Sequence, residues 1–178
     1  MGRDKKSLAE QYQSDTIRKF ENAAVQRFRD AEVLAENGRR LAAIYLYGYS
    51  VEMLLKAACC RLDGIPVNHG IDLETMKRLK SKPETNRRLQ GGGQQAFIVE
   101  NLHDIGGWAQ LMVAELMLQR PQSDRGELRR IVIAVEEIRR RWSPEMRYRP
   151  TDPSEADLRE VREAAGRLRT DIEKIMSK

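Results

Sequence analysis

The sequence predicts an all-α protein, an up-and-down helical bundle of four to five main helices. Apolar residues recur at alternating spacings of three and four in several long segments, which is the repeat of an amphipathic helix. No segment alternates apolar and polar residues over the length of a strand. Aromatic residues make up 6% of the chain and charged residues 33%, a composition that suits a helical bundle better than a sandwich or a barrel.

The chain length of 178 residues suits one domain with its own core. We expect residues 1–13, which are polar, to form a flexible N-terminus, and residues 14–178 to form a single helical domain. The longest apolar run, residues 41–49, is too short to cross a membrane, and no secretory signal opens the chain. We therefore expect a cytoplasmic protein with no membrane partner.

The first two helices are predicted to be antiparallel neighbours. The first is expected to begin near Ser14 or Asp15 and to end at Asn37-Gly38, because glycine accepts the left-handed conformation that closes a helix. The second begins near residue 39 and ends at Asp63-Gly64. Since the connection between them is so short, the second helix must turn back along the first.

The second helix is apolar around almost its whole circumference, which predicts that it is the central helix. Among its few polar residues, Glu52 and Lys56 are four positions apart with the glutamate first, the better order for a helical ion pair. Burying either charge alone is costly, so we expect them to pair with each other or with an arginine from another element. They form either a structural pair at the edge of the bundle or a functional one, in which Glu52 orients a basic residue in a cleft.

Residues 65–101 are the least regular part and are predicted to be an irregular insert. A short helix is expected over residues 73–80, closed by Pro83. Gly91-Gly92-Gly93 then predicts a flexible loop. No Lys-Ser or Lys-Thr follows these glycines, so the segment is not a phosphate-binding P-loop.

Three more helices are predicted after the insert. The first runs from near Asn101 to Pro121, the second from about Asp124 to Trp142, and the third from the capping-box pattern at residues 152–155 to the end of the chain. Residues 131–135 resemble a strand, but a longer helical repeat continues through them. That repeat consists of Leu128, Ile131, Val135, Ile138 and Trp142.

Residues 139–150 hold five arginines with Trp142 and Tyr148, at the end of a predicted helix. Cations are favoured at a helix C-terminus by the helix dipole, which accounts for part of the cluster. Arginine interleaved with aromatic residues also suits phosphate contacts and base stacking. The segment is therefore a solvated helix end, a contact for RNA or a nucleotide, or a protein interface. A net charge of +5, carried by 23 arginines and 9 lysines, is compatible with an anionic partner.

Neither a metal site nor a cofactor is predicted. The two histidines, His69 and His103, belong to no zinc-ligand spacing. The adjacent cysteines Cys59 and Cys60 are expected to fill core volume. Asp104 or Asn101 is expected to cap the helix that starts beside His103, and a catalytic role for this histidine is the less favoured interpretation.

The segment Ala42–Ala58 resembles the second helix of HEPN domains, the nucleotide-binding helical domains named for higher eukaryotes and prokaryotes. In both, a stretch of small and aromatic residues leads into Glu-x-x-Leu-Lys-Ala, here residues 52–57. Ala31 and Leu34 in the preceding helix, the helix start at residues 103–105 and the late Arg147-Tyr148 fit the same layout. The resemblance covers roughly residues 15–175. It implies an up-and-down bundle that often forms a homodimer.

Many HEPN proteins are metal-independent RNases of toxin–antitoxin or phage-defence systems, often paired with a nucleotidyltransferase. Their catalytic motif is an arginine followed by four to six residues and a histidine, at the end of a late helix. Counted from Arg141, the histidine positions hold Met146, Arg147 and Tyr148, so this sequence lacks the motif.

The resemblance and this departure together imply a non-catalytic HEPN-like protein that binds a nucleotide or RNA. The expected ligand-binding residues are Arg141, Arg147, Tyr148, Glu52 and Lys56. One alternative is a protein-interaction module that docks a nucleotidyltransferase partner. Another is a divergent metal-independent endoribonuclease that uses a different residue, His103 or Tyr148.

Overall fold

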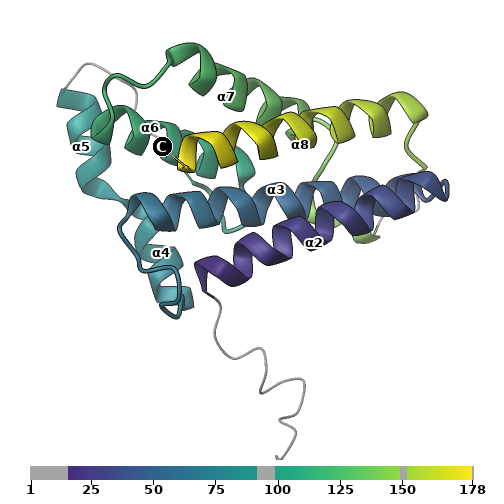
Figure 1. Ribbon diagram of the computed structural model, residues 1–178, viewed down its shortest axis with the longest axis horizontal. Helices are drawn as coiled ribbons and strands as arrows, with labels where there is room; N and C mark the ends of the chain where they lie inside the picture. The colour runs from purple at the N-terminus through teal and green to yellow at the C-terminus, as the bar shows by residue number, and fades with distance from the viewer. Residues whose placement is uncertain (1–15, 92–98, 149–151, 178) are drawn as a thin grey trace, which may run out of the picture.

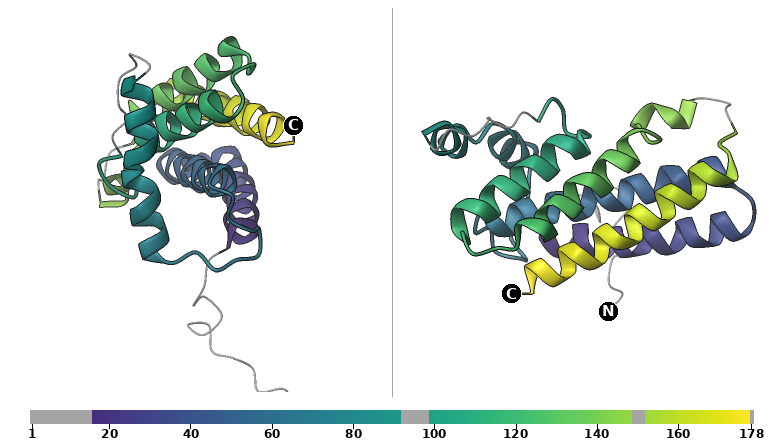
Figure 2. Two further views of the ribbon diagram at one scale, coloured as in Figure 1. Left: turned by 90° about the vertical axis from the view of Figure 1, so that its left-hand side faces the viewer. Right: turned by 90° about the horizontal axis from the view of Figure 1, so that it is seen from above.

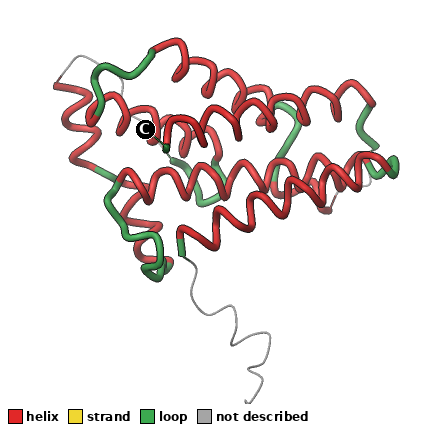
Figure 3. The backbone as a smooth tube through the Cα atoms, in the orientation of Figure 1, coloured by secondary structure: helices red, strands yellow, loops and turns green. Residues whose placement is uncertain are grey.

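The computed structural model describes residues 16–91, 99–148 and 152–177, and the predicted flexible N-terminus at residues 1–13 lies outside them. The described chain is helical and contains no strand, which confirms the predicted all-α class (Figure 3). Within these ranges no helix has both the length and the apolar character that crossing a membrane requires.

The five long helices of the described residues lie in two layers (Figure 1). The first layer is the pair α2 (Ile17–Glu36) and α3 (Arg40–Leu62), which run antiparallel as predicted. The second layer contains α6 (Ile105–Gln119), α7 (Arg125–Arg139) and α8 (Glu155–Met176), seen side by side from above in Figure 2. The number of long helices agrees with the four to five that the apolar repeats predict.

Helix α3 is the centre of the bundle, as its apolar circumference predicts. It packs against α2 on one side and against α6 and α8 on the other, and most of its residues are buried. Cys59 and Cys60 are free thiols within this buried surface, where they fill core volume as expected.

Helix α6 runs parallel to α3, so the chain does not alternate direction throughout. Contacts show the register: His103, just before α6, reaches Glu52 in the middle of α3, whereas Gln119 at the end of α6 donates to the carbonyl of Leu62 at the end of α3. Helices α4 (Leu73–Ser81) and α5 (Pro83–Gly91) form an arm at one end of the bundle (Figure 2). The chain returns from this arm to start α6 beside the middle of α3, which makes the two helices parallel.

Pro83 begins a helix, where the sequence predicts that it only ends one. Proline is tolerated in the first turn because the backbone N–H there has no helical acceptor. Helix α4 agrees with the predicted segment 73–80, whereas α5 was missed. Gly91 is the last residue of α5, and Gly92 and Gly93 lie outside the described residues.

The boundaries of the last two helices also differ from the prediction. Helix α7 ends at Arg139, and a 3-10 helix, η1 (Pro144–Tyr148), follows within the predicted helix end and linker. The N-cap of α8 is Ser154, which forms a capping box with Asp157 two residues beyond the predicted pattern. Both ends of the predicted pattern, Asp152 and Glu155, instead form ion pairs with Arg40 at the start of α3.

Candidate functional site

The candidate site lies where the middle of α3 meets the turn before α6. The predicted ion pair is present: the Nζ of Lys56 lies 2.5 Å from Oε1 of Glu52. Glu52 is only 3% exposed and Lys56 only 8% exposed. Burial strengthens this pairing because little water competes for either charge, and it fixes the carboxylate in one orientation.

Glu52 has a second partner, His103, which the sequence does not connect to it. The imidazole Nδ1 lies 3.1 Å from both carboxylate oxygens. The histidine side chain is 47% exposed, whereas the carboxylate behind it is buried. A buried carboxylate that accepts from Nδ1 orients the ring and leaves Nε2 as the nitrogen available to a ligand. Glu52 therefore pairs with Lys56 as predicted, and its second partner is this histidine and not an arginine.

The turn that carries His103 is held by its own hydrogen bonds. The side chain of Asn101 accepts from the backbone N–H of His103, and Asp104 caps α6 by accepting from the N–H of Gly107. Trp108 Nε1 donates to the carbonyl of Leu102 in the same turn. These contacts place the imidazole on a rigid support, and they show that Asp104, one of the two residues predicted, is the helix cap.

Aromatic rings connect the histidine to the end of α7 and to η1. Tyr49 packs edge-on to His103 and to Trp142, with ring centroids 6.3 and 6.0 Å apart. Its ring also lies 4.9 Å from that of Tyr45. A hydrogen bond with Tyr45 and burial raise the pKa of Tyr49 to about 12, so this phenol stays protonated at neutral pH. We refer to Trp142, Tyr49 and Tyr45 as the aromatic ridge.

Trp142 is fixed directly against the backbone of α3. Its Nε1 donates to the carbonyl of Tyr45 over 3.0 Å, and its ring covers Gly48 so closely that a Cβ there would lie 2.1 Å from the indole. Only glycine allows this approach. The contact positions the segment after α7, and with it η1, over the first half of α3.

Helix η1 carries the two most exposed residues of the predicted ligand set. The guanidinium of Arg147 lies 4.7 Å from the ring centroid of Tyr148, which is 74% exposed. Interactions with Tyr148, and then a hydrogen bond with Tyr45, raise the pKa of Arg147, which is exposed and stays charged. Among the described residues no carboxylate forms an ion pair with Arg147. It is thus a cation available to an anion.

A cavity of about 400 Å³ opens beside His103 and is also lined by Arg139 and Trp142. Arg139, the last residue of α7, packs against the first turn of α6, where a Cβ on Gly106 would meet its guanidinium at 2.7 Å. It forms an ion pair with Glu136 over 2.9 Å. The cavity thus joins an imidazole, a guanidinium and an indole.

Arg141 is engaged by α8 and, among the described residues, forms no hydrogen bond or ion pair with the other predicted site residues. It forms an ion pair with Asp157 at 3.0 Å and another with Glu160, both in α8. These contacts tie the end of α7 to α8. The structure therefore brings Glu52 and Lys56 together and links them through the aromatic ridge to Arg147 and Tyr148, whereas it engages Arg141 elsewhere. Sequence reasoning placed Arg139 in the arginine-rich segment but not among the expected ligand-binding residues, and it missed Tyr45, Tyr49 and the contact of His103 with Glu52.

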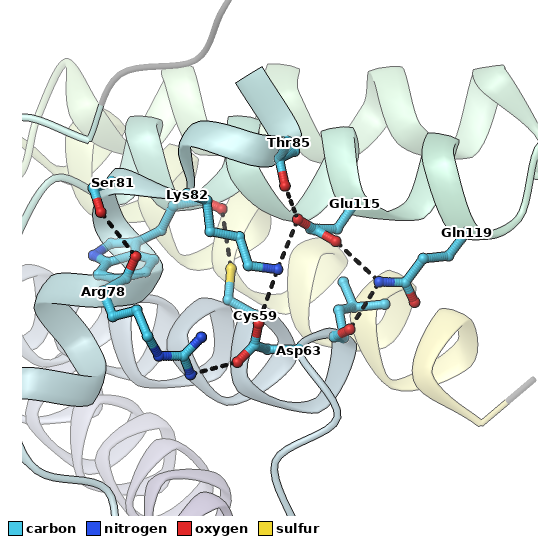
Figure 4. A network of polar contacts seen from close by, with 10 residues as sticks. Cys59, Asp63, Arg78, Ser81, Lys82, Thr85, Glu115 and Gln119 are labelled. Carbon is cyan, nitrogen blue, oxygen red and sulfur yellow. Dashed lines mark hydrogen bonds and ion pairs between the residues drawn. The ribbon is translucent and has the colours of Figure 1, made fainter. Parts of the chain in front are cut away.

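A second polar cluster joins α3 and α6 to the α4–α5 arm (Figure 4). Lys82 donates to Asp63 over 3.0 Å and to Glu115 over 2.8 Å, and Glu115 also accepts from Thr85. Arg78 forms a second ion pair with Asp63. Burial alone would raise the pKa of both carboxyls, but hydrogen bonds from Arg78 and Lys82 to Asp63, and from Lys82 and Thr85 to Glu115, hold them below their ordinary values. The cluster is a satisfied structural network that holds the arm.

Comparisons of this chain with protein-family models, with curated proteins and with solved structures found no match. Nor do the described ranges bring together three or more His, Cys, Asp or Glu residues with metal-ligand geometry. Its function is therefore inferred from its own residues.

Proposed function

We propose that this protein binds a nucleotide or RNA at the surface formed by η1 and the aromatic ridge. The observation that carries this proposal is the exposed Arg147–Tyr148 pair, a cation without a carboxylate partner in the described residues beside a ring that is 74% exposed. A guanidinium suits phosphate oxygens, and an exposed aromatic ring suits a base. Stacking contributes about 1–3 kcal/mol per base.

The HEPN-like architecture, a homodimer and a role in a toxin–antitoxin or phage-defence system belong to the same proposal. They are supported by the resemblance of residues 42–58. The pairing of Glu52 with Lys56 at the buried centre of α3 agrees with a structural or positioning role for that motif. The absent arginine–histidine motif favours binding over catalysis by the family's mechanism.

Fluorescence anisotropy with labelled adenosine monophosphate and with labelled single-stranded RNA tests the proposal. Arg147→Ala and Tyr148→Ala should each weaken binding about tenfold, which corresponds to about 1.4 kcal/mol. Arg159→Ala, which removes an exposed arginine of α8, is the charge-matched control. Equal affinity of all variants and the wild type would contradict the proposed site. Arg141→Ala shows whether the arginine held by α8 also contributes, since a loss equal to that of Arg147→Ala would add it to the site.

A second candidate function, metal-independent RNA cleavage, is favoured by the contact between Glu52 and His103. With Glu52 holding Nδ1, Nε2 is placed to take the proton of a ribose 2′-hydroxyl. The 2′ oxygen then bonds to phosphorus, the bond from phosphorus to the 5′ oxygen breaks, and the leaving oxygen takes a proton from solvent. Cleavage by the wild type that is lost in His103→Gln but kept in His69→Gln would support this activity. No cleavage by the wild type would leave binding alone.

The interaction-module alternative predicts a different outcome of the same assay. If neither labelled adenosine monophosphate nor RNA binds at physiological salt, Arg147 and Tyr148 are better assigned to a protein contact. A stable complex with a nucleotidyltransferase from the host, broken by Arg147→Ala, would then identify the partner.

A further inference from the structure

The outer face of α7 carries a row of arginines that the candidate site does not include. Arg125, Arg129 and Arg140 are all exposed, and none forms an ion pair with a carboxylate within the described part of the chain. At 100° per residue, their spacing of four and eleven places them within about 60° of one another around the helix axis. They therefore form one stripe, which points away from the buried side of α7 and also contains Glu136, the partner of Arg139.

Helix stability does not explain the first two of these arginines. Arg125 is the first residue of α7, where the positive end of the helix dipole repels a cation. Arg125 and Arg129 are also like charges four residues apart, an arrangement that destabilises a helix. Arginines that destabilise their own helix, without a contact that compensates for the loss, indicate a function.

Three of the four arginines of α8 behave differently. Arg162, Arg167 and Arg169 of α8 each pair with a glutamate, namely Glu32, Glu137 and Glu173. The α7 stripe differs because its charges are left to solvent. An exposed apolar side chain, Ile133 (48% exposed), lies among them.

Along the chain, the stripe ends two residues before the candidate site begins. Arg140 is followed by Trp142, the first ring of the aromatic ridge, and the ridge continues through Tyr49 to Tyr45 beside Arg147. From Arg125 to Arg140 the stripe is about 22 Å long, from the rise of 1.5 Å per residue. This length exceeds what one nucleotide spans and fits several phosphates of an extended strand.

We propose that the ligand is a single-stranded polynucleotide whose phosphodiester backbone follows the α7 stripe while a base stacks on Tyr148. This inference rests on the proposed function, because it names the class of nucleotide ligand that the η1 surface takes. Base stacking together with a track of cations is how proteins hold single strands without reading their sequence.

The test compares a labelled strand of about 12 nucleotides, as RNA and as DNA, with labelled adenosine monophosphate across a salt series. The variant is Arg125→Ala with Arg129→Ala. The matched control, Arg87→Ala with Arg88→Ala, removes the same charge from exposed positions on α5. Helical circular dichroism and the melting temperature confirm that both variants fold.

We expect the stripe variant to lower the slope of log affinity against log salt by about 1.4, from about 0.7 per phosphate contact of a single strand. The control should change this slope less, and neither variant should alter binding of adenosine monophosphate. Equal binding of RNA and DNA assigns the recognition to the backbone, whereas preference for RNA adds a contact with the 2′-hydroxyl.

If adenosine monophosphate binds as tightly as the strand, or if both variants change the slope equally, the polynucleotide inference is wrong and the proposed nucleotide site stands. If neither probe binds the wild type, both the proposed function and this inference fail.

Discussion

Replacing Gly48 with alanine is the perturbation whose consequence follows most directly from the structure. The new Cβ would lie 2.1–2.3 Å from three atoms of the Trp142 indole, where ordinary contacts begin near 3.4 Å. The ring must therefore move by more than 1 Å. Because it is buried and its Nε1 donates to Tyr45, the movement disturbs both packing and a hydrogen bond.

Three effects determine the expected loss of stability for Gly48→Ala. Overpacking costs about 1–3 kcal/mol and the weakened hydrogen bond about 1 kcal/mol. The gain from replacing glycine by alanine inside a helix offsets about 0.5–1 kcal/mol. The net loss is about 2 kcal/mol, which corresponds to a melting temperature lower by about 4–8 °C for a chain of this length.

Thermal and urea unfolding measure this loss, and Gly166→Ala is the matched control. Gly166 also lies inside a long helix, but the nearest atom to its added Cβ is Phe28 Cζ at 3.9 Å, so this variant should be neutral or slightly stabilising. In a Trp142→Ala background, Gly48→Ala should lose its cost. Equal effects of the two glycine substitutions, or full additivity with Trp142→Ala, would refute the close contact between Gly48 and the Trp142 ring.

Three further predictions concern buried charges and thiols. Lys82→Met leaves Asp63 and Glu115 buried without their shared cation and should destabilise the fold by about 3–5 kcal/mol in urea unfolding. The folded-state pKa values of both carboxyls are lowered, so the unfolded chain binds more protons. The stability they provide is therefore complete above about pH 5 and is lost as pH falls through those folded values. Acid unfolding followed by circular dichroism measures this dependence, and Glu115→Gln should flatten it. Burial raises the pKa of Cys60 to about 12 and that of Cys59 well above its ordinary value, so a thiol reagent at pH 8 should modify the unfolded protein far faster than the folded one. Equal rates would contradict the burial of these thiols.

Local patterns predicted most of the helices because the helical repeat depends on residues only three or four positions apart. The apolar circumference of residues 40–62 correctly predicted the central helix, and the spacing of Glu52 and Lys56 correctly predicted their ion pair. Errors occurred where a local signal has two meanings. Pro83 both ends one helix and starts another, so α5 was missed.

The candidate site is divided in the same way. Arg147 and Tyr148 were identified from composition at the end of a helix, and the structure leaves both exposed. Arg141 was selected by the same reasoning, but α8 neutralises it through Asp157 and Glu160. No feature of residues 139–150 distinguishes these arginines, because the difference between them lies in a helix that begins several residues later.

The sequence by itself determined the helical class, the central position of α3 and the pairing of Glu52 with Lys56, since each depends on residues within one or two turns of helix. Only the tertiary structure decided that His103 meets Glu52, that Trp142 covers Gly48 and that Arg125, Arg129 and Arg140 form no ion pair within the described residues. The first two contacts join residues that are 51 and 94 positions apart in the sequence. The exposure of the arginines depends on the outer face of α7 having no neighbouring helix in the described part of the chain. They follow from how the layers pack, and no spacing along the chain specifies that packing.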